Sequence, residues 1–348
     1  MQKVWIVSLA TAVPPHVISQ SDAATFATAA FGERFPDFAQ VAGVFMTSGI
    51  RRRRAVRPLE WYLQPLGWPE RSEAYVAGAC ALFVDAARAA LDRAELKAAD
   101  VDTVVTVSST GITTPSLEAR VADAMGFRAE VERVPVFGLG CAGGVSGLSI
   151  AARLAQSRPG SNVLLVAVET CTLSFRADQL SKANVVATAL FGDGAAAMVL
   201  RAEEGGVAEI ESTAQYTWPG TLDIMGWSVD AEGLGVIFDR SIPAFAEEHF
   251  GPAARAMLER SGLGLSDVER FVCHPGGAKV VTALERALEL PQGLLADERA
   301  VLEEYGNMSA PTVFFVLERA LAAGLPRRTL MTAMGPGFSA ATATLRAA

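Results

Sequence analysis

The sequence has few of the residues that bind metals or form redox pairs. Its four cysteines show no CxxC spacing, and its three histidines are dispersed along the chain. Zinc sites and redox dithiols both need such residues at short, paired spacings, so neither is expected. We therefore predict no metal and no cofactor, and a reducing, cytoplasmic location is the simplest interpretation.

Positive charge and long apolar runs are also scarce. The chain carries 30 Lys and Arg against 38 Asp and Glu, and the net charge of −8 argues against nucleic acid as the main partner. No apolar run approaches the length of a membrane span, so no span is expected. The apolar segment Val4–Ala10 follows one lysine and is at the short end for a signal peptide, so we interpret it as a buried first strand.

Apolar residues, in contrast, make up 51% of the 348 positions. Ala- and Leu-rich stretches alternate with Val-rich runs of strand length, which predicts an α/β fold. A strand–Gly-Asp-Gly–strand pattern around 192–194 has a counterpart in a strand–Gly-Pro-Gly–strand pattern around 335–337. We therefore predict two related halves, 1–205 and 206–348, which pack as one body.

The predicted elements follow from these patterns. Strands that are apolar on both faces are typical of a sheet covered by helices. Helices are predicted over residues 72–93, 117–125, 145–156, 250–262, 278–290 and 307–321. Strands are predicted over residues 101–107, 131–137, 163–168, 195–200, 268–273, 329–334 and 339–345.

Cys141 lies in the segment GLGCAGG (138–144), between a predicted strand and a predicted helix. A thiol at this turn would face free backbone N–H groups and the positive end of the helix dipole, both of which favour the thiolate. The glycines would allow a bulky acyl group to approach closely. Cys141 is therefore the predicted nucleophile, whereas Cys80 fits the interior of its helix.

The same segment permits a second interpretation. Residues 138–143 read GxGxxG between a strand and a helix, and the next strand ends at Glu169, where a dinucleotide-binding fold grips a ribose. A Rossmann-type NAD(P)- or flavin-dependent oxidoreductase is therefore an alternative. Against it, the motif lies deep in the chain and leaves Cys141, His274 and Asn307 without a role.

His274 and Asn307 are the candidate partners of Cys141. His274 ends a predicted strand before a rigid Pro-Gly-Gly turn, and such strand ends bind ligands in open α/β sheets. Asn307 lies in a glycine turn before a predicted helix, either as an N-cap or as an amide donor beside His274. Imidazole beside the thiol would give a thiolate–imidazolium pair that attacks a thioester. The N–H groups of His274 and Asn307 would then stabilise the enolate formed when a malonyl thioester loses carbon dioxide.

Five segments between residues 138 and 337 occur in a specific order. They are GLGCAGG at 138–144, ALFGDGAAA at 189–197, HPGG at 274–277, YGNMS at 305–309 and GPG at 335–337. In order and spacing they resemble the type III polyketide synthases, relatives of chalcone synthase in the thiolase superfamily. The resemblance implies a five-layered αβαβα thiolase-like fold, a homodimer, and a tunnel that delivers coenzyme A thioesters to a buried cysteine.

The resemblance further implies an acyltransferase whose catalytic residues are Cys141, His274 and Asn307. An acyl-CoA starter would be held on the cysteine, extended repeatedly with malonyl-CoA, and cyclised in the same cavity. Ketoacyl-ACP synthase III shares the three residue types, but it performs one condensation and usually carries its histidine in an HQAN-like segment. The HPGG segment favours the polyketide synthases.

The resemblance also assigns residues that contact the substrate. Phe191 would be the gatekeeper between tunnel and cavity, and Val236 stands where the family has a second, larger gatekeeper. Thr114 stands where plant members lend a methionine to the partner subunit. These replacements suggest a roomier cavity than in the plant enzymes. The assigned contact residues also include Gly276, Gly335, Pro336 and Gly337.

Three further segments resemble the bacterial alkylpyrone and alkylresorcinol synthases, namely 169–175, 180–184 and 225–227. In those enzymes a side tunnel binds a long acyl chain, and its wall positions correspond to Thr110, Thr114 and Cys171. The predicted reaction therefore converts medium or long acyl-CoA starters and malonyl-CoA to alkylpyrones or alkylresorcinols.

The sites for the phosphates of coenzyme A are harder to assign from the sequence. The lysines and the arginine that bind these phosphates in plant enzymes have no clear match. The four consecutive arginines Arg51–Arg54 could substitute, although such a run is more typical of a solvated face. The predicted partners are acyl-CoA and malonyl-CoA, with the phosphate contacts left open.

Overall fold

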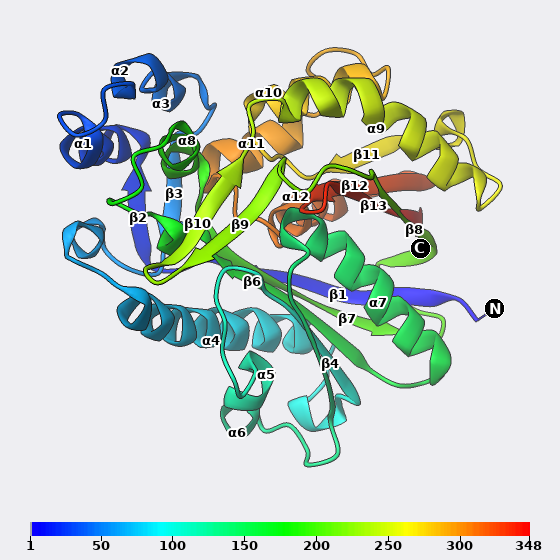
Figure 1. Cartoon of the computed structure of the whole chain (residues 1–348). Helices are drawn as coiled ribbons and strands as arrows, with labels where there is room; N and C mark the ends of the chain where they lie inside the picture. The colour runs from blue at the N-terminus through cyan, green and yellow to red at the C-terminus, as the bar shows by residue number, and fades with distance from the viewer. Residues whose placement is uncertain (1) are drawn as a thin grey trace.

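A computed structural model describes residues 2–348 of the chain (Figure 1). Its strands are β1 (Val4–Ala12), β2 (His16–Ser19), β3 (Arg52–Ala55), β4 (Thr103–Val107), β5 (Glu132–Val136), β6 (Val163–Thr170), β7 (Asp193–Arg201), β8 (Ala208–Thr217), β9 (Met225–Asp230), β10 (Gly233–Phe238), β11 (Arg270–Cys273), β12 (Arg328–Gly335) and β13 (Ser339–Ala347). Nine strands form one mixed sheet in the order β11-β12-β13-β8-β1-β7-β6-β4-β5. The pairs β2–β3 and β9–β10 form two small sheets of their own.

Helices connect these strands and cover the large sheet. The α-helices are α1 (Gln20–Phe31), α2 (Phe38–Val41), α3 (Val44–Thr47), α4 (Trp68–Arg93), α5 (Leu117–Arg120), α6 (Ala122–Met125), α7 (Gly143–Ser157), α8 (Lys182–Leu190), α9 (Ile242–Glu259), α10 (Ala278–Ala287), α11 (Ala296–Tyr305) and α12 (Thr312–Ala322). Short 3-10 helices are η1 (Leu59–Leu63), η2 (Ala98–Asp100), η3 (Gly140–Ala142), η4 (Cys171–Ser174) and η5 (Leu265–Asp267).

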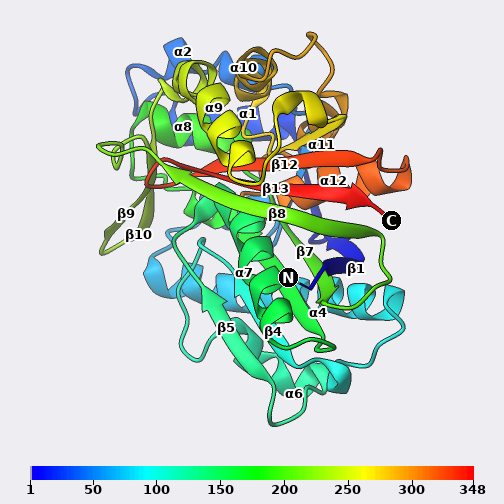
Figure 2. The same cartoon turned by 90° about the vertical axis from the view of Figure 1, so that its right-hand side faces the viewer.

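The large sheet is divided into two parts by the junction between β1 and β8. Only three residue pairs join these two strands. Helix α4 packs on β1, β6 and β7, whereas α9 packs on β8 and β13. Helices α7 and α12 lie between the two parts, because α7 contacts both β6 and β12 and α12 contacts both β1 and β11 (Figure 2). The layer order is therefore helix, sheet, helix, sheet, helix, and the expected thiolase-like α/β fold is confirmed.

Small residues allow the central helix α7 to lie between two layers of strands. A Cβ on Gly147 would come within 2.6 Å of Val107, and one on Gly144 within 2.3 Å of the Ala310 carbonyl oxygen. Leu148, on the same helix, is completely buried. The helix that begins at the cysteine turn is thus held on both sides, which gives that turn a rigid base.

The two predicted halves share this core. Residue 205 falls between β7 and β8, and β1 pairs with both of those strands. One hydrophobic cluster includes Leu9 and Met198 from the first half together with Phe314 and Met331 from the second. The division into 1–205 and 206–348 stays a prediction, since the sheet is continuous across it.

Several element boundaries differ from those expected. The helix predicted over 250–262 begins earlier, at Ile242, because Pro243 occupies its first turn and Pro252 is accommodated inside it. The helix predicted over 307–321 begins only at Thr312. Residues 117–125 form two short helices instead of one, and α11, β8 and the β9–β10 hairpin were not predicted.

Helix α4 is long and apolar enough to span a membrane, although no such segment was expected from the sequence. Among residues 2–348 it is the one helix whose length and composition would allow it to cross a membrane, with a mean hydropathy of 1.4 over 18 residues. Half of that window is buried in the protein, against β1, β6 and β7. Its apolar face is therefore accounted for by packing on the sheet.

Candidate active site

The cysteine turn is packed directly against the C-terminal glycine turn. Cys141 is buried in η3 and follows Gly140, whose φ of +46° lies in the left-handed region. A Cβ on Gly140 would lie 2.6 Å from the Pro336 ring, and one on Gly335 would lie 2.5 Å from the Leu139 carbonyl oxygen. Only glycine permits these approaches, so two segments far apart in the sequence position the thiol together.

The same packing contradicts the dinucleotide-binding interpretation. A Cβ on Gly140, the second glycine of the GxGxxG pattern and the one at which a pyrophosphate would approach the backbone, would lie 2.6 Å from the Pro336 ring, so protein fills that space. Glu169 is completely buried. Its carboxylate accepts the Ser109 backbone N–H at 2.9 Å and the Thr110 hydroxyl at 2.7 Å. No ribose can reach this carboxylate, and the oxidoreductase alternative is wrong.

The three predicted catalytic residues line one buried pocket of about 20 Å³. The Cys141 sulfur lies 4.0 Å from Asn307 Oδ1. Asn307 Nδ2 donates to the Gly276 carbonyl oxygen at 3.2 Å, and Oδ1 accepts the Ser309 backbone N–H at 2.8 Å. His274 follows β11, and neither of its ring nitrogens has a hydrogen-bond partner among residues 2–348. The rest of the wall is mainly apolar and includes Met225, Phe238, Ile242, Met334 and Phe338.

Asn307 is held by a backbone bridge, not as a helix cap. Helix α12 begins five residues later, at Thr312. The Asn307 N–H donates to the Leu190 carbonyl oxygen at 2.8 Å, and the Asn307 carbonyl oxygen accepts the Gly192 N–H at 3.0 Å. Leu190 and Gly192 are the chain neighbours of Phe191, so the two bonds form an isolated β-bridge between Phe191 and Asn307. The N-cap interpretation is therefore wrong, and the structure couples Asn307 to the predicted gatekeeper.

The protonation states of the pocket differ from the sequence expectation. Burial raises the pKa of the Cys141 thiol to about 11, and hydrogen bonding with Ser309 and Asn307 lowers it only in part. Burial also lowers the pKa of His274 to about 4. These shifts favour the neutral forms of both side chains near pH 7, because the mainly apolar pocket removes the hydration that a charged group needs. Burial in the pocket thus opposes the thiolate that the N–H groups and the helix dipole of the turn were expected to favour.

Phe191 lies directly after α8, at one side of the catalytic pocket. Its ring packs edge to face on Trp227, with centroids 6.2 Å apart, and on Phe238, with centroids 6.5 Å apart. Trp227 pairs with Val236 across the β9–β10 hairpin. The hairpin that the sequence analysis missed therefore supplies this wall, while the gatekeeper roles of Phe191 and Val236 stay predictions.

The three residues expected along an acyl tunnel do not share a cavity. Cys171 lines an apolar chamber next to Phe191. Thr110 lines a different cavity of about 30 Å³, and its hydroxyl is bound to Glu169. Thr114 is exposed and belongs to neither wall. The structure thus separates these three positions, which a single tunnel was expected to join.

The arginine run is divided between the surface and the interior of the protein. Arg51 and Arg52 form ion pairs with Glu303 and Glu304 of α11. Arg53 is 2% exposed and donates to three backbone carbonyl oxygens at the end of α8. Burial lowers the pKa of this guanidinium to about 10. For the buried Arg53, both the solvated-face interpretation and the phosphate-binding interpretation are wrong. Arg51 is exposed and Arg52 is partly exposed, as the solvated-face interpretation expects, and both are already paired with carboxylates.

An open groove of about 540 Å³ adjoins the catalytic pocket. Three exposed cations line it, Lys182, Arg240 and Lys279. Lys182 pairs with Asp37 at 3.0 Å, whereas Arg240 and Lys279 have no ion-pair partner among residues 2–348. Sequence reasoning missed these cations, although Lys279 comes only two residues after the HPGG segment. The groove and the pocket share the wall residues Phe238, Ile242, Gly276 and Val280.

The remaining cysteines and histidines add no further site. Cys273 is completely buried in the cluster beneath α9 and α10, as a core residue. Across residues 2–348 no three His, Cys, Asp or Glu side chains are placed to hold a metal ion. That the reaction needs no metal or cofactor stays a prediction.

Comparison with known proteins places this geometry among related chains. Residues 66–204 match the family described as chalcone and stilbene synthases, N-terminal domain, and residues 209–347 match its C-terminal domain. A 1,3,6,8-tetrahydroxynaphthalene synthase of Streptomyces peucetius subsp. caesius is 38% identical over 98% of this chain and 92% of its own. An α-pyrone synthesis polyketide synthase-like protein of Mycobacterium tuberculosis is 29% identical over 96% of this chain and 88% of its own. The crystal structure of the 1,3,6,8-tetrahydroxynaphthalene synthase of Streptomyces coelicolor A3(2), a bacterial type III polyketide synthase, superposes with a TM-score of 0.93 at 30% identity over 99% of both chains.

Proposed function

This chain belongs to the chalcone and stilbene synthase family and is a type III polyketide synthase, and from that premise we propose its starter, its catalytic residues and its product. A medium- or long-chain acyl-CoA is loaded on Cys141, extended repeatedly with malonyl-CoA, and cyclised to an alkylpyrone or alkylresorcinol. The observation that supports this best is the convergence of Cys141, His274 and Asn307 on one buried, mainly apolar pocket.

Loading begins from a neutral thiol and a neutral imidazole. The proton on Cys141 Sγ passes to a ring nitrogen of His274, and the thiolate attacks the thioester carbonyl carbon of the starter. The bond between that carbon and the coenzyme A sulfur then breaks, and the imidazolium returns the proton to the departing sulfur. Because pKa values of about 11 and 4 oppose the first transfer, we infer that the ion pair forms only as the substrate accepts the negative charge.

Extension uses the same residues as hydrogen-bond donors. When malonyl-CoA loses carbon dioxide, the enolate oxygen that forms accepts N–H groups from His274 and Asn307. Asn307 Nδ2 gives one N–H to Gly276 at 3.2 Å and has a second N–H available. The enolate carbon attacks the acyl carbonyl on Cys141, the new carbon–carbon bond forms, and the bond from that carbonyl to the cysteine sulfur breaks.

The open groove is the proposed site for the phosphates of coenzyme A. Arg240 and Lys279 are cations without an ion-pair partner among residues 2–348, at a groove that shares its walls with the catalytic pocket. Lys279→Glu should raise the KM for malonyl-CoA about tenfold, the cost of one charge-assisted contact. The KM for malonyl N-acetylcysteamine, a thioester without phosphates, should change far less. Equal effects on both thioesters would remove Lys279 from the phosphate site.

A second candidate product is 1,3,6,8-tetrahydroxynaphthalene, favoured by the 38% identity to a synthase of that name. This product carries no alkyl chain. The deciding experiment incubates the enzyme with malonyl-CoA alone and with acyl-CoAs of graded length, followed by mass spectrometry. Pyrones or resorcinols that carry the starter's alkyl chain support the proposal, and tetrahydroxynaphthalene from malonyl-CoA alone supports the second candidate. A ketoacyl product of one condensation would instead indicate a reaction of the ketoacyl-ACP synthase III kind.

We also propose that the enzyme is a homodimer in the cytoplasm. Thr114, at the position expected to face a partner subunit, is exposed, and nearby Ile112 is 53% exposed. Phe137 is 56% exposed and precedes Gly138, whose N–H donates to Ser109 in the neighbouring segment. These apolar side chains form a surface that a second copy would cover. Light scattering should give twice the chain mass, and Ile112→Glu should lower it to that of one chain.

A further inference from the structure

One hydroxyl in the wall of the catalytic pocket has no hydrogen-bond partner. Thr332, on β12, is 1% exposed, and its Oγ1 is buried without a partner among residues 2–348. The rest of that wall consists of apolar side chains, Gly276 and the three predicted catalytic residues, so Thr332 supplies its one hydroxyl. A buried hydroxyl loses its bonds to water on folding, and one that finds no partner in the protein is costly. Such a group is expected where a ligand completes its bonding.

The strand register directs the Thr332 side chain into the pocket. Thr332 pairs with Cys273 in the parallel ladder of β11 and β12, so the two side chains lie on the same face of the sheet. Met334, two residues along β12, lies on that face as well and belongs with Cys273 to the cluster beneath α9 and α10. Met334 lines the catalytic pocket together with Ile242 of α9 and Leu284 of α10. The Thr332 hydroxyl therefore lies on the wall that faces these two helices.

The backbone of Thr332 also holds His274. The His274 N–H donates to the Thr332 carbonyl oxygen at 2.8 Å, which continues the β11–β12 ladder one residue beyond the end of β11. Neither ring nitrogen of His274 has a partner among residues 2–348, so the Thr332 hydroxyl is not used to orient the imidazole. Three unpartnered polar atoms, one on Thr332 and two on His274, thus surround one small space.

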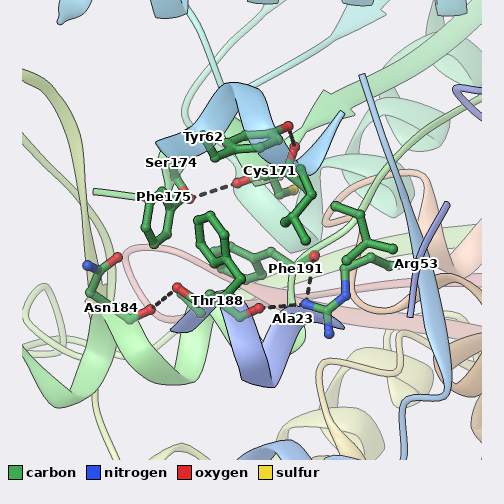
Figure 3. A pocket seen from close by; sticks show the side chains of 14 residues that line it. Ala23, Arg53, Tyr62, Cys171, Ser174, Phe175, Asn184, Thr188 and Phe191 are labelled. Atoms are coloured by element: carbon green, nitrogen blue, oxygen red, sulfur yellow. Dashed lines mark hydrogen bonds between the residues drawn. The ribbon is translucent and has the colours of Figure 1, made fainter. Parts of the chain in front are cut away.

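The hydroxyls of the neighbouring chamber, in contrast, are bonded within the protein. This chamber of about 40 Å³ adjoins Phe191 and is lined mainly by residues of α1, η1, η4 and α8 (Figure 3). The hydroxyls of Tyr62 and Thr172 share a bond of 2.6 Å, and those of Ser174 and Thr188 each donate to a backbone carbonyl oxygen at 2.7 Å. Of the hydroxyls that line the two cavities in residues 2–348, only that of Thr332 is left for a ligand.

The position of the pocket decides which ligand reaches this hydroxyl. The pocket shares Ile242 and Val280 with the cationic groove, and it also contains the Cys141 thiol. A coenzyme A thioester that enters from the groove therefore brings its acyl group into this pocket. The starter and malonyl-CoA both take this route, but only malonyl-CoA carries a free carboxylate. Because His274 and Asn307 donate to the thioester oxygen, the Thr332 hydroxyl remains as a donor for that carboxylate.

We propose that Thr332 recognises the extender, because its hydroxyl donates a hydrogen bond to the free carboxylate of malonyl-CoA. The inference rests on the proposed function and adds to it a residue that distinguishes the extender from the starter. The carboxylate leaves as carbon dioxide, and the electron pair of the broken carbon–carbon bond becomes that of the enolate. The bond to Thr332 is therefore made in the ground state and lost during the reaction, so it lowers the KM for malonyl-CoA without raising kcat.

The test uses two isosteric variants of the same strand. Thr332→Val removes the hydroxyl and keeps the shape of the side chain. Its control is Thr329→Val, because Thr329 is completely buried on the opposite face of β12, its hydroxyl also lacks a partner among residues 2–348, and it does not line the pocket.

The main measurement is the release of carbon dioxide from malonyl-CoA without a starter. In Thr332→Val the KM for malonyl-CoA should rise about ten- to a hundredfold, the cost of one hydrogen bond to a charged group, while kcat changes less than about threefold. Thr329→Val should leave both constants at their wild-type values. A rise of equal size in the two variants would show a general effect on β12 and overturn the inference.

Two further measurements separate this role from a structural one. Loading of Cys141 by an acyl-CoA, measured as the covalent adduct by intact-protein mass spectrometry, should keep its wild-type rate in Thr332→Val, since the starter has no free carboxylate. The midpoint of urea unfolding should stay the same or rise in both variants, because each loses a buried hydroxyl without a partner. A lower midpoint confined to Thr332→Val would make the hydroxyl a structural group and contradict the inference.

The remaining outcomes distinguish the inference from the proposed function. If the wild-type enzyme neither loads an acyl-CoA nor decarboxylates malonyl-CoA, the proposed function and the inference both fail. If it does both, an unchanged KM for malonyl-CoA in Thr332→Val overturns the inference alone. Equal rises in the KM for malonyl-CoA and for the starter would assign the hydroxyl to the pantetheine arm that both share, and would overturn it as well. If Thr332→Val does not fold, Thr332→Ser and Thr332→Ala decide, since only the alanine variant should raise the KM for malonyl-CoA.

Discussion

Two cavities lie on either side of the contact between Phe191, which lines the chamber, and Phe238, which lines the catalytic pocket, and their polar groups differ in whether they have hydrogen-bond partners. In the catalytic pocket, neither ring nitrogen of His274 has a partner among residues 2–348, and burial keeps the Cys141 thiol neutral. In the chamber, the hydroxyls of the wall are bonded within the protein, as between Tyr62 and Thr172. A buried polar group without a partner is costly, and it persists where a substrate uses it. Of the two cavities, the catalytic pocket is therefore the one whose titratable ring nitrogens stay available for chemistry.

Both cavities are buried and largely apolar. They differ in whether the polar groups of their walls have hydrogen-bond partners within the protein. In the catalytic pocket a neutral imidazole can accept the thiol proton, and the same ring can later donate to an enolate. In the chamber, the wall atoms without a partner among residues 2–348 are Arg53 Nε and Asn184 Oδ1, and no imidazole lines the space. Substitutions of polar groups in the catalytic pocket should therefore reduce activity more than substitutions of polar groups in the chamber.

Removal of the nucleophile should have the largest effect on activity. Cys141→Ala leaves no sulfur to hold the acyl group, so product formation should fall about 10⁴-fold or more. Intact-protein mass spectrometry after incubation with acyl-CoA should show no covalent adduct on this variant. Cys80→Ala, a half-buried cysteine of α4, is the matched control and should load normally. An adduct on Cys141→Ala would refute the assignment.

Loss of the amide donor should have the next largest effect. Asn307→Ala removes an N–H group from the enolate oxygen, and decarboxylation of malonyl-CoA should slow about 10²- to 10³-fold. Release of carbon dioxide measures this step without any starter. The bridge from Asn307 to the segment of Phe191 runs through the backbone, so Asn307→Ala and Asn307→Asp both keep it, and Asn307→Asp replaces the amide donor with a carboxyl group. Unchanged decarboxylation in both variants would show that the amide does not act on the enolate.

The pH dependence of alkylation should show whether the Cys141 thiol is protonated in the free enzyme near pH 7. The raised pKa of Cys141, about 11, means that the reactive thiolate is rare at pH 7 and becomes more abundant as pH rises. Alkylation of the free enzyme by iodoacetamide should therefore accelerate about tenfold per pH unit between about pH 7 and 10. Cys141→Ala gives the background rate. A plateau already below pH 7 would mean that a thiolate–imidazolium pair exists before substrate binds.

The smallest expected effect concerns the segment that carries Phe191. Arg53→Met removes the donors to three backbone carbonyl oxygens at the end of α8. The free energy of unfolding should fall by about 2–4 kcal/mol, because these carbonyl groups stay buried without partners. Urea unfolding measures the change, and Arg54→Met, at the adjacent and less buried position, is the control. Equal losses in both variants would contradict a special role for Arg53.

Much of the site could be predicted from residues that lie close together in the sequence. The glycine turn around Cys141, the strand end before His274 and the turn at Asn307 are local patterns, and the structure brings all three to one pocket. The α/β class follows equally from local periodicity. Boundaries were less certain where prolines or short hairpins decide them, as at Pro243 and in the β9–β10 pair.

The sequence by itself determined the fold class, the family and the identity of the three residues that converge at the pocket. Only the tertiary structure decided that Cys141 and His274 are neutral, that Arg53 is buried, and that Cys171 and Thr110 line different cavities. The physical reason is that hydration, and with it each pKa, depends on every atom that surrounds a group, and these atoms come from distant segments. Local sequence patterns specify how the backbone turns at a residue. They do not specify which distant side chains will exclude water from that residue.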